Sequence, residues 1–213
     1  STIGRRPHGR VLPARSLVLA AIAFALSACA TTPPMPLVDD GERVFRERLA
    51  ELAALDEWGL SGRVSVRIDG RGWHASLDWR QRDDGYRLNL FGPFGRGLAQ
   101  ISANAGGVTM ITEDNRTVQA ADADDLVYRE LGWPLPIDGL RDWILGRPAP
   151  ETAQGHEITI DQWGRPELLR QDGWEIRYLR YGGALCPTMP DRLRLTRDDV
   201  TVSIIIDEWR LDR

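Results

Sequence analysis

Few side chains in this 213-residue chain have the type and spacing that catalysis requires. All 27 basic residues are arginine, because the sequence contains no lysine. This excludes Schiff-base chemistry, pyridoxal-phosphate sites and the Walker A phosphate loop. His74 and His156 have no companions at metal-ligand spacing, and the chain has no Cys-x-x-Cys motif. We therefore expect no catalytic residue, no metal ligand and no cofactor.

The side chain with the most definite chemistry is the Cys29 thiol. A basic start without acids leads into an apolar run over residues 16–26, which is shorter than the roughly 20 residues that span a bilayer. The run ends in Leu26-Ser27-Ala28-Cys29, which resembles the lipobox of bacterial lipoproteins. The resemblance implies that residues 1–28 are a cleaved signal peptide and that Cys29 is acylated. A plain signal peptide with an incidental cysteine is the alternative.

The residues after Cys29 predict a tether rather than a folded element. Residues 30–39 contain three prolines and no hydrophobic periodicity. We expect residues 29–39 to form the acylated N-terminus and tether, and residues 40–213 to form the folded body. Ala30 rather than aspartate follows the cysteine, which implies the outer membrane by resemblance to enterobacterial lipoprotein sorting. The predicted location is therefore the periplasmic face of the outer membrane, with Cys29 as the lipid anchor.

Charge and cysteine use restrict the partners of the body. Residues 1–28 contain four arginines and no acid, so residues 29–213 carry 23 basic and 31 acidic side chains, a net charge of about −8. Such a body lacks the basic face that nucleic-acid binding requires. Cys186 has no intrachain disulfide partner once Cys29 is acylated, and we interpret it as a small buried apolar residue rather than a reactive thiol.

Hydrophobic periodicity predicts the elements that must position a binding site. Residues 40–55 predict a helix that begins at Asp40 as its N-cap, with Arg48 and Leu52 on one face. Beyond it the period is two, which is typical of antiparallel strands with one apolar face. Two helices, over 122–131 and 136–145, are inserted after the sixth strand. The expected strands cover residues 60–68, 73–80, 86–90, 97–104, 107–112, 116–120, 156–163, 166–172, 173–180, 191–197 and 200–209.

An antiparallel sheet of this size curls towards a barrel or deep half-barrel, because strands twist. Helices from the insertion could cover its open side. Periodicity alone leaves two interiors open: a dry core filled by the strand side chains, or a cavity for an apolar ligand.

Three stretches of the body resemble, in order after the lipobox, the outer-membrane lipoprotein LolB family. They are residues 79–95, ending in Phe-Gly-Pro-Phe-Gly; residues 132–148, with Gly-Trp-Pro-Leu-Pro and Leu-Arg-Asp-Trp-Ile-Leu-Gly-Arg-Pro; and residues 189–195. The resemblance implies a mainly β fold, an unclosed antiparallel β-barrel of about eleven strands with an apolar internal cavity. An N-terminal helix precedes the barrel, and an inserted helical segment forms a lid. It also implies a monomeric lipoprotein that accepts acylated cargo from the periplasmic carrier LolA and inserts it into outer-membrane lipid.

The inward strand faces would then bind acyl chains, and the second inserted helix would act as the lid. By the same resemblance, Phe94 after Pro93 occupies the loop between the third and fourth strands, where the family carries an exposed apolar residue, usually leucine, that pushes cargo into the bilayer. A loop folded back with Phe94 in the core is the alternative. The predicted acyl-binding residues are Val64, Val66, Trp73, Leu77, Trp79, Leu88, Leu90, Leu140, Trp143, Ile144, Ile204 and Ile206.

Two other function classes remain open. A tethered scaffold lipoprotein of envelope assembly would use the same anchor with a filled core. A periplasmic hydrolase is the weaker alternative, because no Gly-x-Ser-x-Gly or other positioned nucleophile and base occurs. Glu57, Asp78 and the acidic group Asp122, Asp124 and Asp125 are more typical of helix caps and surface charges than of a catalytic carboxylate pair.

Overall fold

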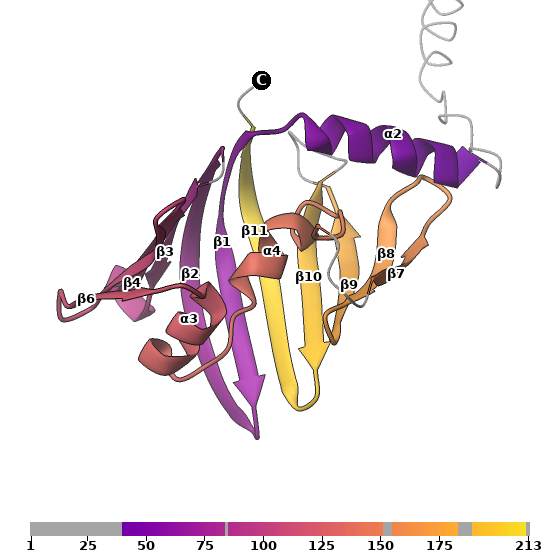
Figure 1. Cartoon of the computed structure of the whole chain (residues 1–213). Helices are drawn as coiled ribbons and strands as arrows, with labels where there is room; N and C mark the ends of the chain where they lie inside the picture. The colour runs from indigo at the N-terminus through magenta and orange to yellow at the C-terminus, as the bar shows by residue number, and fades with distance from the viewer. Residues whose placement is uncertain (1–39, 84, 151–154, 183–188, 212–213) are drawn as a thin grey trace, which may run out of the picture. The chain divides into compact units, whose positions relative to one another are not determined.

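The computed structural model in Figure 1 describes residues 40–211 apart from residues 84, 151–154 and 183–188. The described residues all lie in one compact unit, Pro36–Arg213. Its helices are α2 (Gly41–Ala53), α3 (Ala123–Leu131) and α4 (Ile137–Trp143), with a short 3-10 turn, η2 (Pro93–Gly95). Its strands are β1 (Glu57–Ile68), β2 (Arg71–Arg82), β3 (Gly85–Phe91), β4 (Gly97–Asn104), β5 (Gly107–Thr112), β6 (Thr117–Ala120), β7 (His156–Ile160), β8 (Pro166–Gln171), β9 (Trp174–Tyr181), β10 (Pro190–Arg197) and β11 (Val200–Leu211).

All eleven strands form one antiparallel sheet in the order β6-β5-β4-β3-β2-β1-β11-β10-β9-β8-β7. The first and last strands pair at its centre, with Val64 opposite Ile204, while β6 and β7 are the two edges. The sheet is therefore unclosed. The predicted eleven strands, the fold class and the helical insertion after the sixth strand are confirmed.

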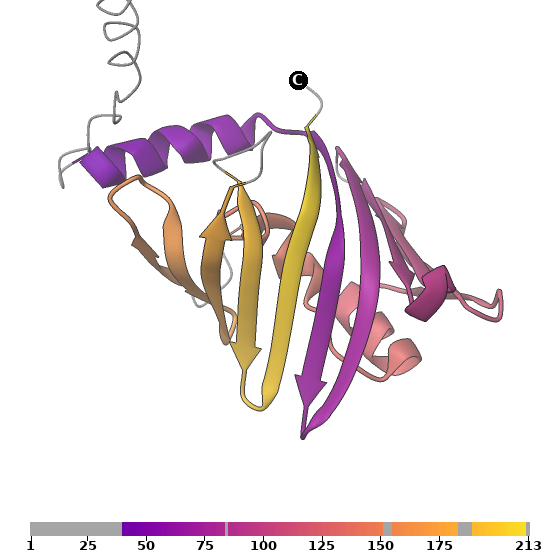
Figure 2. The ribbon, with the colours of Figure 1, turned by 180° about the vertical axis from the view of Figure 1, so that it is seen from behind.

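The two faces of the sheet differ in what covers them. In Figure 1, α3 and α4 lie against one face of the curled sheet. Figure 2, from behind, shows the opposite face of β10, β11, β1 and β2 with none of the described helices over it. The burial of β1 follows this division, because Leu60, Val64 and Val66 are buried whereas Arg63 and Arg67 are exposed. The predicted alternation is thus confirmed, and the inner face is the one that the insertion covers.

A bulge in β11 interrupts the regular pairing at the centre of the sheet. The register of β1 on β11 shifts between Ser61 and Gly62. A Cβ at Gly62 would lie 2.3 Å from the carbonyl oxygen of Ile205, so only glycine fits this close approach of the two backbones.

Two local predictions need correction. Asp40 precedes α2, but its side chain makes no capping hydrogen bond and instead lies 3.3 Å from the Arg43 guanidinium. The seventh strand ends at Ile160 rather than residue 163, because the Asp161 carboxylate accepts hydrogen bonds from the backbone N–H groups of Trp163 and Arg165, each at 2.9 Å. These bonds build a turn in place of further ladder. No helix within the described ranges has the length and apolar character needed to cross a membrane.

Candidate functional site

The predicted acyl-binding residues of the strands lie on the inner face, as expected, and they are covered. We call eight residues of β1, β2, β3 and β11 the covered face, and each is between 1 and 5% exposed, or fully buried. Trp73, near the start of β2, is only half-buried. The covered face consists of Val64, Val66, Leu77, Trp79, Leu88, Leu90, Ile204 and Ile206.

The predicted lid residues supply that cover. Leu140, Trp143 and Ile144 are spaced three and four apart along α4 and its C-terminal end, so they share one helix face, and each is at most 1% exposed. Gly139 makes room for the indole, because a Cβ there would lie 2.4 Å from the Trp143 ring. The helix ends before Gly146, whose φ of 81° suits glycine. The sequence of α4 therefore allows this short helix to pack its apolar face into the interior of the sheet.

Polar contacts hold the α4 lid on the sheet. The Trp143 indole N–H donates to Gln171 Oε1 at 2.8 Å, and the Gln171 amide bonds the backbone N–H and C=O of Ala149 at 2.9 and 3.0 Å. The Tyr178 hydroxyl donates to the carbonyl of Trp143 at 2.8 Å. Sequence reasoning missed Gln171, since a glutamine at a strand end gives no signal of burial. These bonds satisfy the polar groups that the buried lid brings into the core.

A carboxylate joins α4 to α3. Asp124 Oδ1 accepts hydrogen bonds from the backbone N–H groups of Ile137 at 2.7 Å and Asp138 at 3.3 Å, at the start of α4. Burial raises the pKa of the Asp124 carboxyl to about 6, although these N–H donors act in the opposite direction. Asp122 caps α3 by accepting from the N–H of Asp125 at 2.7 Å. The prediction that this acidic group contains helix caps is confirmed.

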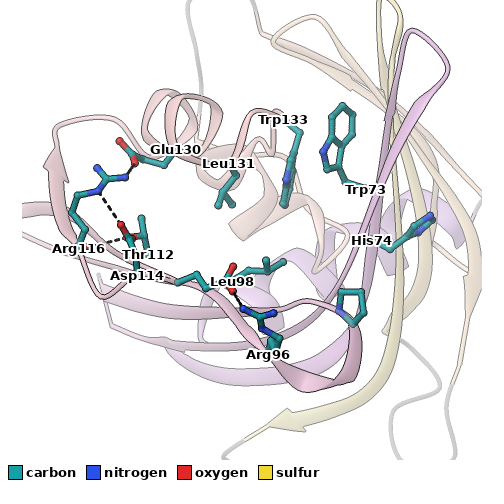
Figure 3. A pocket seen from close by; sticks show the side chains of 12 residues that line it. Trp73, His74, Arg96, Leu98, Thr112, Asp114, Arg116, Glu130, Leu131 and Trp133 are labelled. Carbon is teal, nitrogen blue, oxygen red and sulfur yellow. Dashed lines mark hydrogen bonds and ion pairs between the residues drawn. The ribbon is translucent and has the colours of Figure 1, made fainter.

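Beside the covered face lies a pocket of about 790 Å³, which we call the open pocket. Figure 3 shows the Trp73 and Trp133 side chains at one end of it, while Leu98 of β4 and Leu131 of α3 line it nearer the charged side chains. Of the twelve predicted acyl-binding residues, Trp73 alone lines it. Trp133 and Leu131 were not predicted, because they lie at and beyond the end of α3, where no alternating pattern marks an inward side.

Charged side chains form the rim of the open pocket. Arg116 lies 2.7 Å from a Glu130 carboxylate oxygen, and Arg96 pairs with Glu113 (Figure 3). These pairs join the loops and strands of one wall to each other and to α3. The pocket therefore has an apolar interior and a neutralised polar entrance, an arrangement suited to an amphipathic ligand.

The loop between β3 and β4 presents Phe94 to solvent. Its side chain is completely exposed, at 104% of the reference area. Its φ of 63° lies in the left-handed region, which a bulky residue rarely adopts. The Gly92 N–H donates to the Arg96 carbonyl at 2.8 Å and closes the loop at its base. The alternative with Phe94 in the core is therefore excluded, and Pro93 beside it lines the open pocket.

Residues 56–209 match the family model described as Outer membrane lipoprotein LolB. The chain belongs to the LolB family. The match includes the three body stretches that carry the sequence resemblance, together with the covered face, the α4 lid and the Phe94 loop. Cys29, the tether and Cys186 lie outside the described residues, so the anchor stays a prediction.

Relatives of this LolB family member extend the similarity over nearly the whole chain. The Outer-membrane lipoprotein LolB of Chromohalobacter salexigens is 35% identical over 205 residues, which are 96% of this chain and 94% of the relative. That of Halorhodospira halophila is 34% identical over 187 residues, 88% of this chain and 90% of the relative.

Solved structures share the fold at low identity. A DUF1329 family protein from Desulfovibrio piger superposes with a TM-score of 0.52 at 9% identity, covering 82% of this chain and 93% of that one. A putative outer membrane lipoprotein-sorting protein domain from Vibrio parahaemolyticus gives a TM-score of 0.50 at 10% identity, covering 83% and 94%. At this level of identity these likenesses show the fold alone.

Proposed function

We propose that this LolB family member accepts acylated lipoproteins from the periplasmic carrier LolA and inserts them into the outer membrane. The acyl chains enter through the open pocket and spread onto the covered face as the α4 lid lifts. The Phe94 loop then contacts the bilayer and directs release. The observation that carries this proposal is one apolar interior, part of it open beside Trp73 and part of it beneath a short helix.

The energetics of acyl chains favour such a route. Each buried methylene contributes about 0.8 kcal/mol, so chains must pass between proteins without entering water. The sequence has no nucleotide-binding motif, and transfer must therefore run downhill, from carrier to this interior and on to the bilayer. The volume of about 790 Å³ lies within the range of roughly 300–1,000 Å³ usual for small-ligand sites. A lipoprotein with several acyl chains requires more volume than this pocket offers, and displacement of the α4 lid would provide it.

The test is a transfer assay from cargo-loaded carrier to liposomes, with and without the acylated protein. We expect cargo to reach the liposomes only when the protein is present. Equal transfer without it would contradict the proposal. Cys29→Ala should release the protein from the membrane fraction, and retention of that variant would contradict the proposed anchor.

The Phe94 role is tested by separating acceptance from insertion. Phe94→Glu should accept cargo from the carrier normally and pass little of it to liposomes, because a carboxylate resists entry into lipid. Tyr128→Glu is the matched control, since Tyr128 is an exposed aromatic residue on α3. Unchanged insertion by the Phe94 variant, or equal loss in both variants, would remove the role from this loop.

A tethered scaffold lipoprotein is the second candidate, favoured by the complete burial of the covered face. A scaffold would keep the lid closed and bind no acyl chain. Displacement of a fluorescent fatty acid by unlabelled fatty acid distinguishes the two, because only the receptor takes up the probe.

A further inference from the structure

Three buried polar atoms of the inner face have no hydrogen-bond partner among the described residues. They are the indole nitrogen Nε1 of Trp79, the amide oxygen Oε1 of Gln81 and the hydroxyl of Tyr86. The three side chains are 1%, 6% and 5% exposed, respectively. Buried polar groups are nearly always paired, because an unmade hydrogen bond is costly. Three such groups in one place call for an explanation.

The three groups are neighbours on two adjacent strands. Gln81 of β2 lies opposite Tyr86 of β3 and opposite Trp58 of β1 in the strand register. Trp79 lies two residues before Gln81 and so shares its face. Its ring centroid is 5.7 Å from that of Tyr86 and 5.5 Å from that of Trp58. We call Trp79, Gln81 and Tyr86 the polar cluster.

The polar cluster adjoins a second pocket, of about 390 Å³. Gln81 and Trp58 line it from the sheet, and Arg141 lines it from α4. The Arg141 guanidinium lies 5.9 Å from the centre of the Tyr86 ring, and it forms no ion pair with any residue of the described ranges. Arg141 thus lies over the Tyr86 ring without being fixed by a carboxylate of the described ranges. Movement of α4 would therefore carry this cation away from the cluster.

The chemistry of the cluster defines the ligand that it fits. The indole N–H can only donate, the amide Oε1 can only accept, and the hydroxyl can do either. Burial raises the pKa of the Tyr86 hydroxyl, which therefore stays protonated and able to donate. Two neutral donors and one acceptor suit ester carbonyls and an amide N–H. Leu88 and Leu90 extend the same inner face with apolar surface.

We propose that the polar cluster binds the ester and amide groups that join acyl chains to the head of a lipoprotein, with Arg141 as its movable cover. This inference rests on the proposed function and specifies which part of the cargo is recognised by hydrogen bonds. The chains lie on the covered face, and the linkage lies at Trp79, Gln81 and Tyr86. The site thereby selects acyl chains attached to a carbonyl head over plain hydrocarbon.

The experiment compares two probes that differ only in their linkage: dipalmitoylglycerol, with two ester carbonyls, and its dihexadecyl ether, with none. Each displaces a fluorescent fatty acid from the whole chain carrying Cys29→Ala, which removes the protein's own acyl group as a competitor. The diester should bind about three- to tenfold more tightly than the diether, as expected for one or two additional hydrogen bonds.

Tyr86→Phe is the decisive variant, because it removes the hydroxyl and keeps the ring. It should weaken diester binding severalfold, leave diether binding unchanged, and leave the thermal unfolding midpoint unchanged or higher, since the lost group was unpaired. Tyr128→Phe, on the exposed surface of α3, is the control and should change none of these values.

The outcomes separate the two proposals. Equal affinity of the unsubstituted protein for both probes overturns the polar cluster as a linkage site while the receptor function stands. Equal weakening of both probes by Tyr86→Phe overturns it as well, since that result indicates packing rather than hydrogen bonding. Binding of neither probe overturns the proposed function and this inference with it.

Discussion

The covered face and the open pocket lie on the same side of one sheet, yet they differ in what faces them. The covered face meets α4, whose Trp143 is buried and hydrogen-bonded to Gln171. The open pocket meets the end of α3 and Trp133, and ion pairs form its rim. Ion pairs near water do not collapse onto an apolar surface, because desolvating charge is costly. The difference teaches that this interior is divided into a packed part beneath α4 and a part that is open to solvent.

The most direct test of whether the two regions are packed differently is to truncate one leucine in each of them. Leu88→Ala on the covered face should lower the free energy of unfolding by about 2–5 kcal/mol, because it leaves a cavity in a packed core. Leu98→Ala, at a half-buried leucine of the open pocket, should lower it by about 1 kcal/mol, because less area is lost. Urea unfolding of both variants measures the difference.

Equal losses of stability would mean that the two regions are packed alike and that the open pocket closes in solution. The burial of the covered face also decides where a substitution can block acyl uptake. A bulky polar residue at Leu88 or Val66, each at most 2% exposed, would destabilise the fold as well as block uptake. Trp73, which is only half-buried, is the better position for a blocking substitution.

The second prediction concerns the bonds that keep the lid in place. Gln171→Leu leaves the Trp143 indole N–H and the backbone groups of Ala149 without their partner. We expect a loss of about 2–3 kcal/mol in the free energy of unfolding. Amide hydrogen exchange should accelerate in α4 more than in α3, since only α4 loses its attachment.

Gln119→Leu provides the control, because Gln119 is exposed on the edge strand β6. Exchange that accelerates equally throughout the sheet in the Gln171 variant would contradict a local lid. It would indicate instead that the covered face and α4 open only with global unfolding.

The third prediction uses the carboxylate between α3 and α4. The pKa of Asp124 is raised from 3.8 to about 6 in the folded protein, so the folded state holds this proton more tightly than the unfolded chain does. Its contribution to stability is therefore fully present below pH 4 and is lost as the pH rises through 6. The expected change is about 2 kcal/mol. Asp124→Asn should remove this dependence in urea unfolding at pH 4 to 7, and an unchanged pH profile in that variant would assign it to other groups.

The period-two pattern was sufficient to predict the eleven strands and the inward side of β1, β2 and β11. Successive side chains of a strand point to opposite faces of the sheet, whichever strand it pairs with. The sequence pattern therefore assigns Val64 and Ile204, which lie opposite each other, to the same inner face. The lid residues Leu140, Trp143 and Ile144 were predicted because their helical spacing and the family resemblance agree. Phe94 was predicted from the resemblance together with the glycines on either side of it.

The division of the interior could not be predicted from the sequence. It depends on Gln171 meeting Trp143 from a distant strand and on Trp133 lining the same open pocket as Trp73. These contacts join segments that are far apart in the chain and that no local period relates. The three polar atoms of the polar cluster were also invisible, since alternation marks Tyr86 and Trp79 only as inward and aromatic.

The smallest expected effect belongs to the rim of the open pocket. The Arg116 side chain is 55% exposed and that of Glu130 is 15% exposed where they contact, and ion pairs that reach water contribute little to stability. Arg116→Gln should therefore leave the urea midpoint within experimental error of the unsubstituted protein, in contrast to the change at Leu88. The affinity for an anionic fatty-acid probe should become more sensitive to salt, because Glu130 loses its partner and the entrance becomes more negative. A midpoint shift as large as that of Leu98→Ala would mean that the rim holds α3 in place, and the open pocket would then depend on its charges for its shape rather than only for its entrance.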